Sequence, residues 1–83
     1  MAETKQILVV EDHQPMAEAI DSILTMEGYA VSTAADGIEA LQAMEGGAPD
    51  LIIADILMPD MDGYEFYQEV QGHLAWRSIP FIF

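Results

Sequence analysis

The sequence has no cysteine and only two cationic side chains, against fifteen acidic ones. Without cysteine, the chain can form neither a disulfide bond nor a thiolate zinc site. The formal net charge is −13, so the phosphates of nucleic acid and an anionic membrane surface would both repel the chain. We therefore exclude direct nucleic-acid binding and membrane-surface binding as functions.

Long apolar runs and a secretory leader are also lacking. Apolar runs such as residues 7–10 are far too short to cross a bilayer, and no basic-then-apolar segment follows Met1. The absence of cysteine also fits a reducing compartment, so we expect a cytoplasmic protein. Because 52% of the residues are hydrophobic, the chain is too apolar for a disordered acidic tail, and residues 1–83 are expected to form one domain.

Apolar runs and helical periodicity alternate along the chain. The predicted strands are residues 7–10, 30–34, 51–54 and 79–83, of which the first and third are apolar throughout, as in strands buried on both faces. The predicted helices run from Pro15 to Gly28, from Ile38 to Met44 and from Tyr64 to Leu74. This β-α-β-α-β-α-β order predicts an α/β fold with a parallel sheet covered on both faces.

Acidic residues follow the two most apolar strands. Glu11 and Asp12 come after the first of these strands, and Asp55 comes after the second. Ligands bind beyond the carboxyl ends of parallel strands, so neighbouring strands would bring the three carboxylates together. Such a cluster is unfavourable without a cation or protons, and its oxygen ligands suit Mg²⁺. A carboxylate beside Mg²⁺ can accept a phosphoryl group.

These motifs carry a resemblance to a known family. The first strand with Glu11-Asp12, the strand ending at Asp55 and the loop at residues 58–63 together resemble the receiver domain of two-component response regulators. Residues 36–41 and 79–83 fit the same family. The resemblance implies a flavodoxin-like, three-layer α/β/α sandwich, of which these 83 residues lack the fifth strand and the last helices. It also implies a non-enzymatic phospho-accepting signalling domain.

The resemblance assigns roles to individual residues. It makes Asp55 the phospho-acceptor, Asp12 a direct Mg²⁺ ligand and Glu11 a ligand acting partly through water. The backbone carbonyl of Leu57 would be a further Mg²⁺ ligand. The implied partner is a histidine kinase or a phosphotransfer protein, which would donate the phosphoryl group.

Receivers also carry a Thr or Ser after the fourth strand and a Lys after the fifth, and neither position lies within these 83 residues. Lys5 cannot replace that lysine, because it precedes the strand that Asp12 follows. Seven extended residues place the two roughly 23 Å apart. Arg77 lies at the same wrong end of the sheet. We therefore expect impaired phosphorylation, since removing one preorganised donor costs ~3–4 kcal/mol of transition-state stabilisation.

Two further expectations concern partners. Without a fifth strand, residues 79–83 would be an apolar edge, which favours self-association through this fourth strand. The alternative function is a non-phosphorylated protein-interaction module on a receiver scaffold.

An EF-hand calcium loop is disfavoured, although Asp60, Asp62, Gly63 and Glu69 match four of its positions. Met58 would occupy the first ligand position, and the segment before it is a predicted strand instead of a helix. Asp62 fits better as the N-cap of the following helix.

Overall fold

Four parallel strands form one sheet in the computed structural model, which describes residues 4–56 and 61–83. The strands are β1 (Gln6–Val10), β2 (Ala30–Ala34), β3 (Leu51–Ala54) and β4 (Phe81–Ile82). Their spatial order is β2-β1-β3-β4, so the two strands with continuous apolar runs are central neighbours. The predicted parallel α/β architecture is confirmed.

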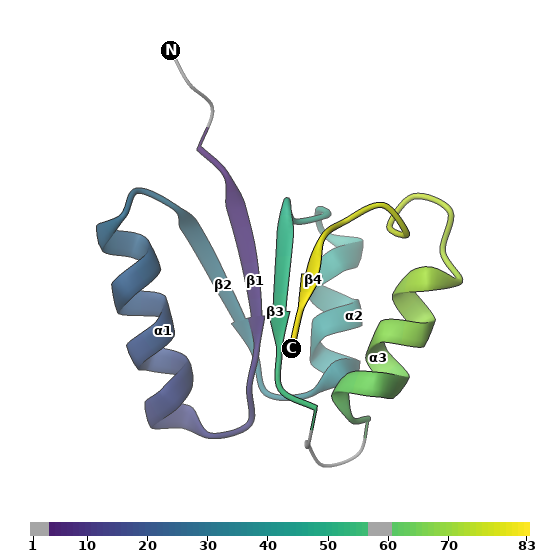
Figure 1. Cartoon of the computed structure of the whole chain (residues 1–83), viewed down its shortest axis with the longest axis horizontal. Coiled ribbons are helices and arrows are strands. Elements are labelled where there is room, and N and C mark those ends of the chain that lie inside the picture. Colours follow the sequence, from purple (N-terminus) through teal and green to yellow (C-terminus); the bar gives the residue numbers. More distant parts are fainter. Residues whose placement is uncertain (1–3, 57–60) are drawn as a thin grey trace.

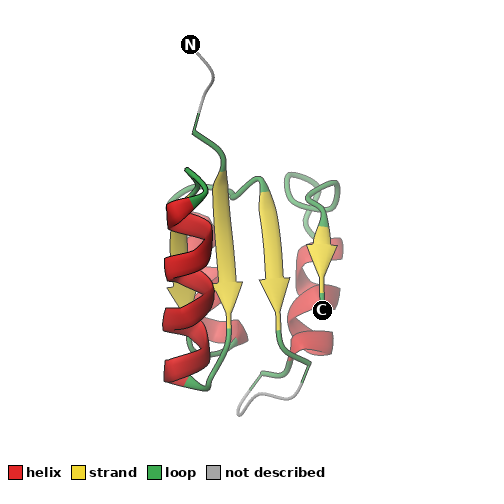
Figure 2. Ribbon diagram, turned by 60° about the vertical axis from the view of Figure 1, so that its left-hand side comes forward, coloured by secondary structure: helices red, strands yellow, loops and turns green. Residues whose placement is uncertain are grey.

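Helices cover the two faces of the sheet unequally. Helix α1 (Gln14–Met26) lies on one face, whereas α2 (Gly37–Glu45) and α3 (Gly63–Gln71) lie together on the other (Figure 1). In Figure 2, α1 stands in front of the sheet beside β1, and no other described helix lies on that side. None of the helices in the described segments is long and apolar enough to cross a membrane.

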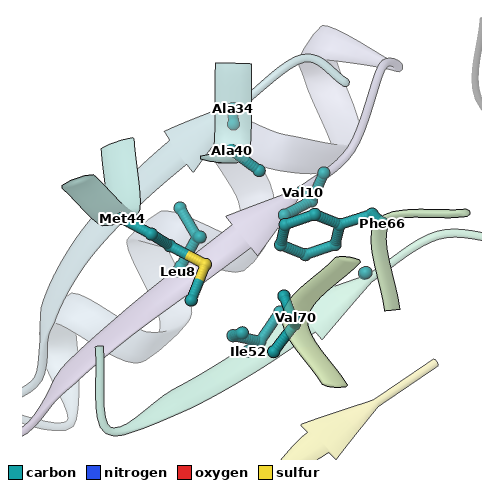
Figure 3. Packing of buried hydrophobic residues seen from close by; sticks show 9 residues of the cluster. Leu8, Val10, Ala34, Ala40, Met44, Ile52, Phe66 and Val70 are labelled. Atoms are coloured by element: carbon teal, nitrogen blue, oxygen red, sulfur yellow. The ribbon is translucent and has the colours of Figure 1, made fainter. Parts of the chain in front are cut away.

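The main core fills the space between the sheet and the helix pair α2 and α3. Alternate residues of β1 and β3 point into it, because side chains alternate between the faces of a strand. Leu8, Val10 and Ile52 pack there with Phe66 and Val70 of α3 (Figure 3). The opposite faces of the same strands meet α1, which buries Ala17. Both central strands are thus apolar on both faces, as their sequences require.

Side-chain caps define where the helices begin. The Asp36 carboxylate accepts a hydrogen bond from the Glu39 N–H at the start of α2, and the Asp62 carboxylate accepts one from the Glu65 N–H at the start of α3, each at 2.9 Å. The predicted N-cap role of Asp62 is confirmed. Each cap satisfies one of the backbone N–H groups that the first helical turn leaves unpaired.

Two predicted boundaries were wrong. Helix α3 ends at Gln71 instead of Leu74, because the hydrogen bonds change after its C-cap, Gly72: the His73 N–H donates to the Val70 carbonyl, three residues back instead of four, at 3.1 Å. The fourth strand was predicted over residues 79–83, but β4 comprises only Phe81–Ile82. Pro80 has no N–H to donate and contributes only its carbonyl, which accepts from the Ile52 N–H at 3.0 Å.

Candidate functional site

The carboxyl ends of β1 and β3 bring three acidic side chains together. Val10 and Ala54 are register partners at these ends, and the Asp55 N–H donates to the Val10 carbonyl at 2.9 Å. Carboxylate oxygens of Glu11, Asp12 and Asp55 lie within 4.8 Å of one another. The structure therefore brings together the three acidic residues predicted from the sequence to form a cluster, because the strands that precede them are parallel neighbours.

Glu11 has the least favourable position in this cluster. It is partly buried, and its Oε2 atom is buried with no hydrogen-bond partner among the described residues. Partial burial raises the pKa of Glu11 above its ordinary value of 4.5, and the neighbouring Asp55 and Asp12 carboxyl groups raise it further. Both effects act because they disfavour the charged form of Glu11.

The donor set fits Mg²⁺. Three oxygen-bearing side chains converge, and a cation would give the buried Glu11 Oε2 the partner that it lacks in the described structure. Mg²⁺ binds through one or two carboxylates and keeps several waters, so direct and water-mediated ligands at such spacing are compatible with it. The Leu57 carbonyl, predicted as a further ligand, lies outside the described residues.

Glycine at position 63 allows the start of α3 to lie against the backbone that directly follows β3. The Gly63 N–H donates to the Ile56 carbonyl at 2.9 Å. A Cβ atom at position 63 would overlap the Asp55 carbonyl oxygen and lie 2.9 Å from the Ile56 Cα. Only glycine lets the start of α3 approach the backbone of the central acidic residue this closely.

A second contact near the start of α3 was missed from the sequence. Met61 lies against the start of α2, where its carbonyl accepts the Gly37 N–H at 3.2 Å and its side chain covers Gly37. Met61 and Gly37 are far apart in the sequence, and neither lies in a run of regularly spaced apolar residues that would predict their contact. The only feature of the sequence that pointed to this contact was the Asp36-Gly37 turn.

His13 lies next to the cluster but serves a structural purpose. It is the N-cap of α1, and its Nδ1 atom accepts the Met16 N–H at 3.3 Å. The first turn of α1 thus begins directly after Asp12. This cap helps to fix where the chain leaves the acidic cluster.

The chain belongs to the response regulator receiver domain family, whose model matches residues 7–83. This family consists of non-enzymatic signalling modules that work with histidine kinases. The acidic cluster at the ends of β1 and β3 resembles the phospho-acceptor site of the family.

Three known proteins illustrate the similarity. Response regulator Rre1 of Synechocystis sp. is 34% identical over 84 residues, covering 100% of this chain and 36% of that protein. The signal receiver domain of a signal transduction histidine kinase from Syntrophus aciditrophicus is 40% identical with a TM-score of 0.90, covering 94% of this chain and 59% of the other.

The third is the receiver domain of sensor histidine kinase PA1611 from Pseudomonas aeruginosa, solved with a magnesium ion coordinated in its active-site cleft. It is 33% identical with a TM-score of 0.89, covering 95% of this chain and 65% of the other. The chain thus spans 36% of the length of the curated relative and 59–65% of the two solved ones.

Proposed function

We propose that the protein is a phospho-accepting signalling domain that receives a phosphoryl group on Asp55 with Mg²⁺ bound. The observation that supports this most is the convergence of Glu11, Asp12 and Asp55 within 4.8 Å, with a buried Glu11 oxygen unpartnered among the described residues. The donor would be a histidine kinase or a phosphotransfer protein. Since such kinases use ATP, we propose a cytoplasmic location.

The chain's own residues have distinct tasks in this reaction. A carboxylate oxygen of Asp55 forms a bond to phosphorus as the bond from phosphorus to the donor nitrogen breaks, and the leaving imidazole takes up a proton. Asp12 and Glu11 would hold Mg²⁺, which would offset the negative charge of the phosphoryl oxygens. The backbone hydrogen bond from Asp55 to Val10 keeps the nucleophile at the strand end.

Phosphorylation of the 83-residue chain by itself should be slow. The family's Thr or Ser and Lys positions are not among these residues, and its one lysine, Lys5, precedes β1 at the opposite end of the sheet. A missing donor to the phosphoryl oxygens lowers the rate because the charge developing in the transition state is then less well stabilised. Magnesium binding depends on the acidic residues and should persist.

Mass spectrometry of the intact chain tests this proposal. The chain is incubated with Mg²⁺ and a small phosphodonor, and one added phosphoryl group is expected. The Asp55→Asn variant should gain none, whereas Asp62→Asn, which alters an acid at a helix cap, should react like the unaltered chain. No adduct, or an equal adduct in Asp55→Asn, would favour the alternative of a non-phosphorylated protein-interaction module.

The chain should also pair with itself through its fourth strand. Strand β4 lies at the edge of the sheet, and its Ile82 is 52% exposed. An uncovered apolar edge lowers its free energy by contacting another copy.

A further inference from the structure

Strand β2 is the outermost strand of the sheet on the side away from β4 (Figure 1). No strand of the described residues pairs with its outer side. Ala30 donates to the backbone just before β1 and Ala34 accepts from the backbone just after it, each at 2.9 Å. Because alternate residues of a parallel strand bond to the same neighbour, the N–H and C=O groups of Val31 and Thr33 point to the open edge.

The open edge of β2 carries none of the features that usually prevent another strand from adding to a sheet. Natural edge strands are protected by charged side chains, by proline or by a bulge. The residues of β2 are Ala-Val-Ser-Thr-Ala, and all five pair with β1 in one unbroken register. Ser32 and Thr33 are exposed. The edge is therefore regular and uncharged along its whole length.

Helices on both faces of the sheet limit what can reach this edge. Strand β2 contacts α1 on one face and α2 on the other (Figure 1). A partner must therefore approach in the plane of the sheet, where the outward N–H and C=O groups of Val31 and Thr33 lie. An extended segment satisfies these groups by becoming a further strand, which is how peptides add to exposed sheet edges. The geometry thus favours an extended segment over a helix.

The flank of α1 next to this edge is acidic. Met16 and Ile20 line a hollow together with residues of β3, so the opposite flank of α1 faces β2. Glu18 and Asp21 lie on that opposite flank, because successive residues of a helix are rotated by about 100°. The Asp21 carboxylate accepts a hydrogen bond from the Thr25 hydroxyl at 2.8 Å, one turn further along the same flank. Two carboxylates therefore border the open edge on this face.

The two ends of β2 add to this negative charge. Glu27 precedes the strand and Asp36 follows it. The chain has two cations, of which Arg77 lies between α3 and β4, far along the sheet. Lys5 lies beside the amino end of β2 and lines a hollow with Leu51 of β3, on the other side of β1. The surroundings of the open edge are therefore negative.

We propose that the open edge of β2 binds an extended, basic segment of a partner protein as an added strand. Backbone hydrogen bonds to Val31 and Thr33 would hold this segment, and its cationic side chains would lie near the acids on α1. A second copy of this chain fits less well, because each copy would bring the same acids to the contact. The inference is independent of phosphoryl transfer to Asp55.

Nuclear magnetic resonance of the ¹⁵N-labelled chain with a defined peptide tests this site. The probe is the acetylated and amidated peptide Lys-Thr-Lys-Val-Lys-Thr-Lys, and its acidic counterpart has glutamate in place of each lysine. We expect the basic peptide to slow hydrogen exchange at the Val31 and Thr33 amides, because both would then be hydrogen-bonded. The acidic peptide should bind about tenfold more weakly or less, since the acids near the edge repel it.

Matched variants separate strand addition from general attraction between charges. Thr33→Pro removes an outward N–H and should weaken binding of the basic peptide about tenfold, whereas Thr33→Val keeps this donor and should bind normally. Should Thr33→Pro not fold, a peptide N-methylated at its three central residues tests the same bonds from the partner's side and should also bind about tenfold more weakly. Glu18→Gln combined with Asp21→Asn should weaken binding, and Glu69→Gln, at an exposed acid on α3, should not.

Equal binding of the basic and acidic peptides, or of the plain and N-methylated peptides, would overturn the proposal. Protection that appears at β4 or at the acidic cluster instead of at Val31 and Thr33 would overturn it as well. Protection of these two amides that rises with chain concentration, without any peptide, would identify a second copy as the occupant. Phosphoryl transfer to Asp55 is measured without peptide, so each result leaves the phospho-acceptor proposal to its own test.

Discussion

Replacing Gly63 with alanine should destabilise the protein more than the same change at Gly37, Gly46 or Gly72. The added Cβ would overlap the Asp55 carbonyl oxygen and lie 2.9 Å from both the Asp55 carbonyl carbon and the Ile56 Cα. All three are backbone atoms of the strand end that carries the acidic cluster, so none can move aside without shifting Asp55. The substitution therefore perturbs stability and the site together.

The size of the effect follows from the contacts. Forcing an extra carbon into a filled space costs typically about 3 kcal/mol at the upper end, while alanine returns about 0.5–1 kcal/mol by restricting the unfolded chain. A net loss of about 2 kcal/mol is large for a domain of this size, whose total stability is about 4–12 kcal/mol. Gly37→Ala should cost less, because its Cβ would meet the flexible Met61 side chain, at 2.7 Å.

Urea unfolding followed by far-ultraviolet circular dichroism measures these changes. With a slope of about 1 kcal/mol per molar urea, the midpoint of Gly63→Ala should fall by about 2 M. Gly46→Ala is the matched control, because its nearest neighbour would be 3.5 Å away and its φ is −79°. Equal midpoints for the Gly63→Ala and Gly46→Ala variants would refute the close approach of α3 to the Asp55 backbone.

Three further predictions concern charge, core and cap. The raised pKa of Glu11 means that the folded state binds its proton more tightly than the unfolded state, so its destabilising effect grows as the pH rises from 4.5 through the folded-state pKa. Without Mg²⁺, Glu11→Gln should thus be more stable than the unaltered chain near neutral pH, and urea unfolding should show this difference vanishing towards pH 4.5; a pH-independent difference would contradict it. Phe66→Ala should lower the free energy of unfolding by about 3–5 kcal/mol, because this side chain is 0% exposed. Loss of the near-ultraviolet circular dichroism signal would report the loosened core. An unchanged signal with an unchanged urea midpoint would contradict the place of Phe66 in the core. His13→Ala should cost about 1 kcal/mol in urea unfolding through the lost cap of α1 and His13→Asn should recover it; equal stability of both variants would exclude the cap.

The order of strands and helices and the acidic cluster could be predicted because local sequence carries the necessary information. An apolar run such as Leu51–Ala54 has no polar side to expose, so it must lie in the middle of a covered sheet. Once the two such strands are neighbours and parallel, the acids that follow them must meet. The N-cap at Asp62 was equally local, since its carboxylate bonds to the N–H three residues later.

The remaining features depend on contacts between distant segments. The contact of Met61 with Gly37 joins the start of α2 to the segment before α3, and no spacing rule relates the two positions. The strand after α3 was overestimated because its apolar residues predict pairing, whereas ladder bonds also need donors that Pro80 does not have. The raised pKa of Glu11 likewise depends on how deeply the folded chain buries it.

Magnesium titration of stability tests most directly whether Glu11, Asp12 and Asp55 form one metal site. At tenfold excess over its Kd, Mg²⁺ should add about 1.4 kcal/mol to the free energy of unfolding, measured against NaCl of equal ionic strength. Asp12→Asn and Asp55→Asn should lose this gain, while Glu69→Gln, on the exposed side of α3, should keep it. Equal Mg²⁺ stabilisation of all four proteins would show that the ion only screens the net charge of −13 and would contradict the site.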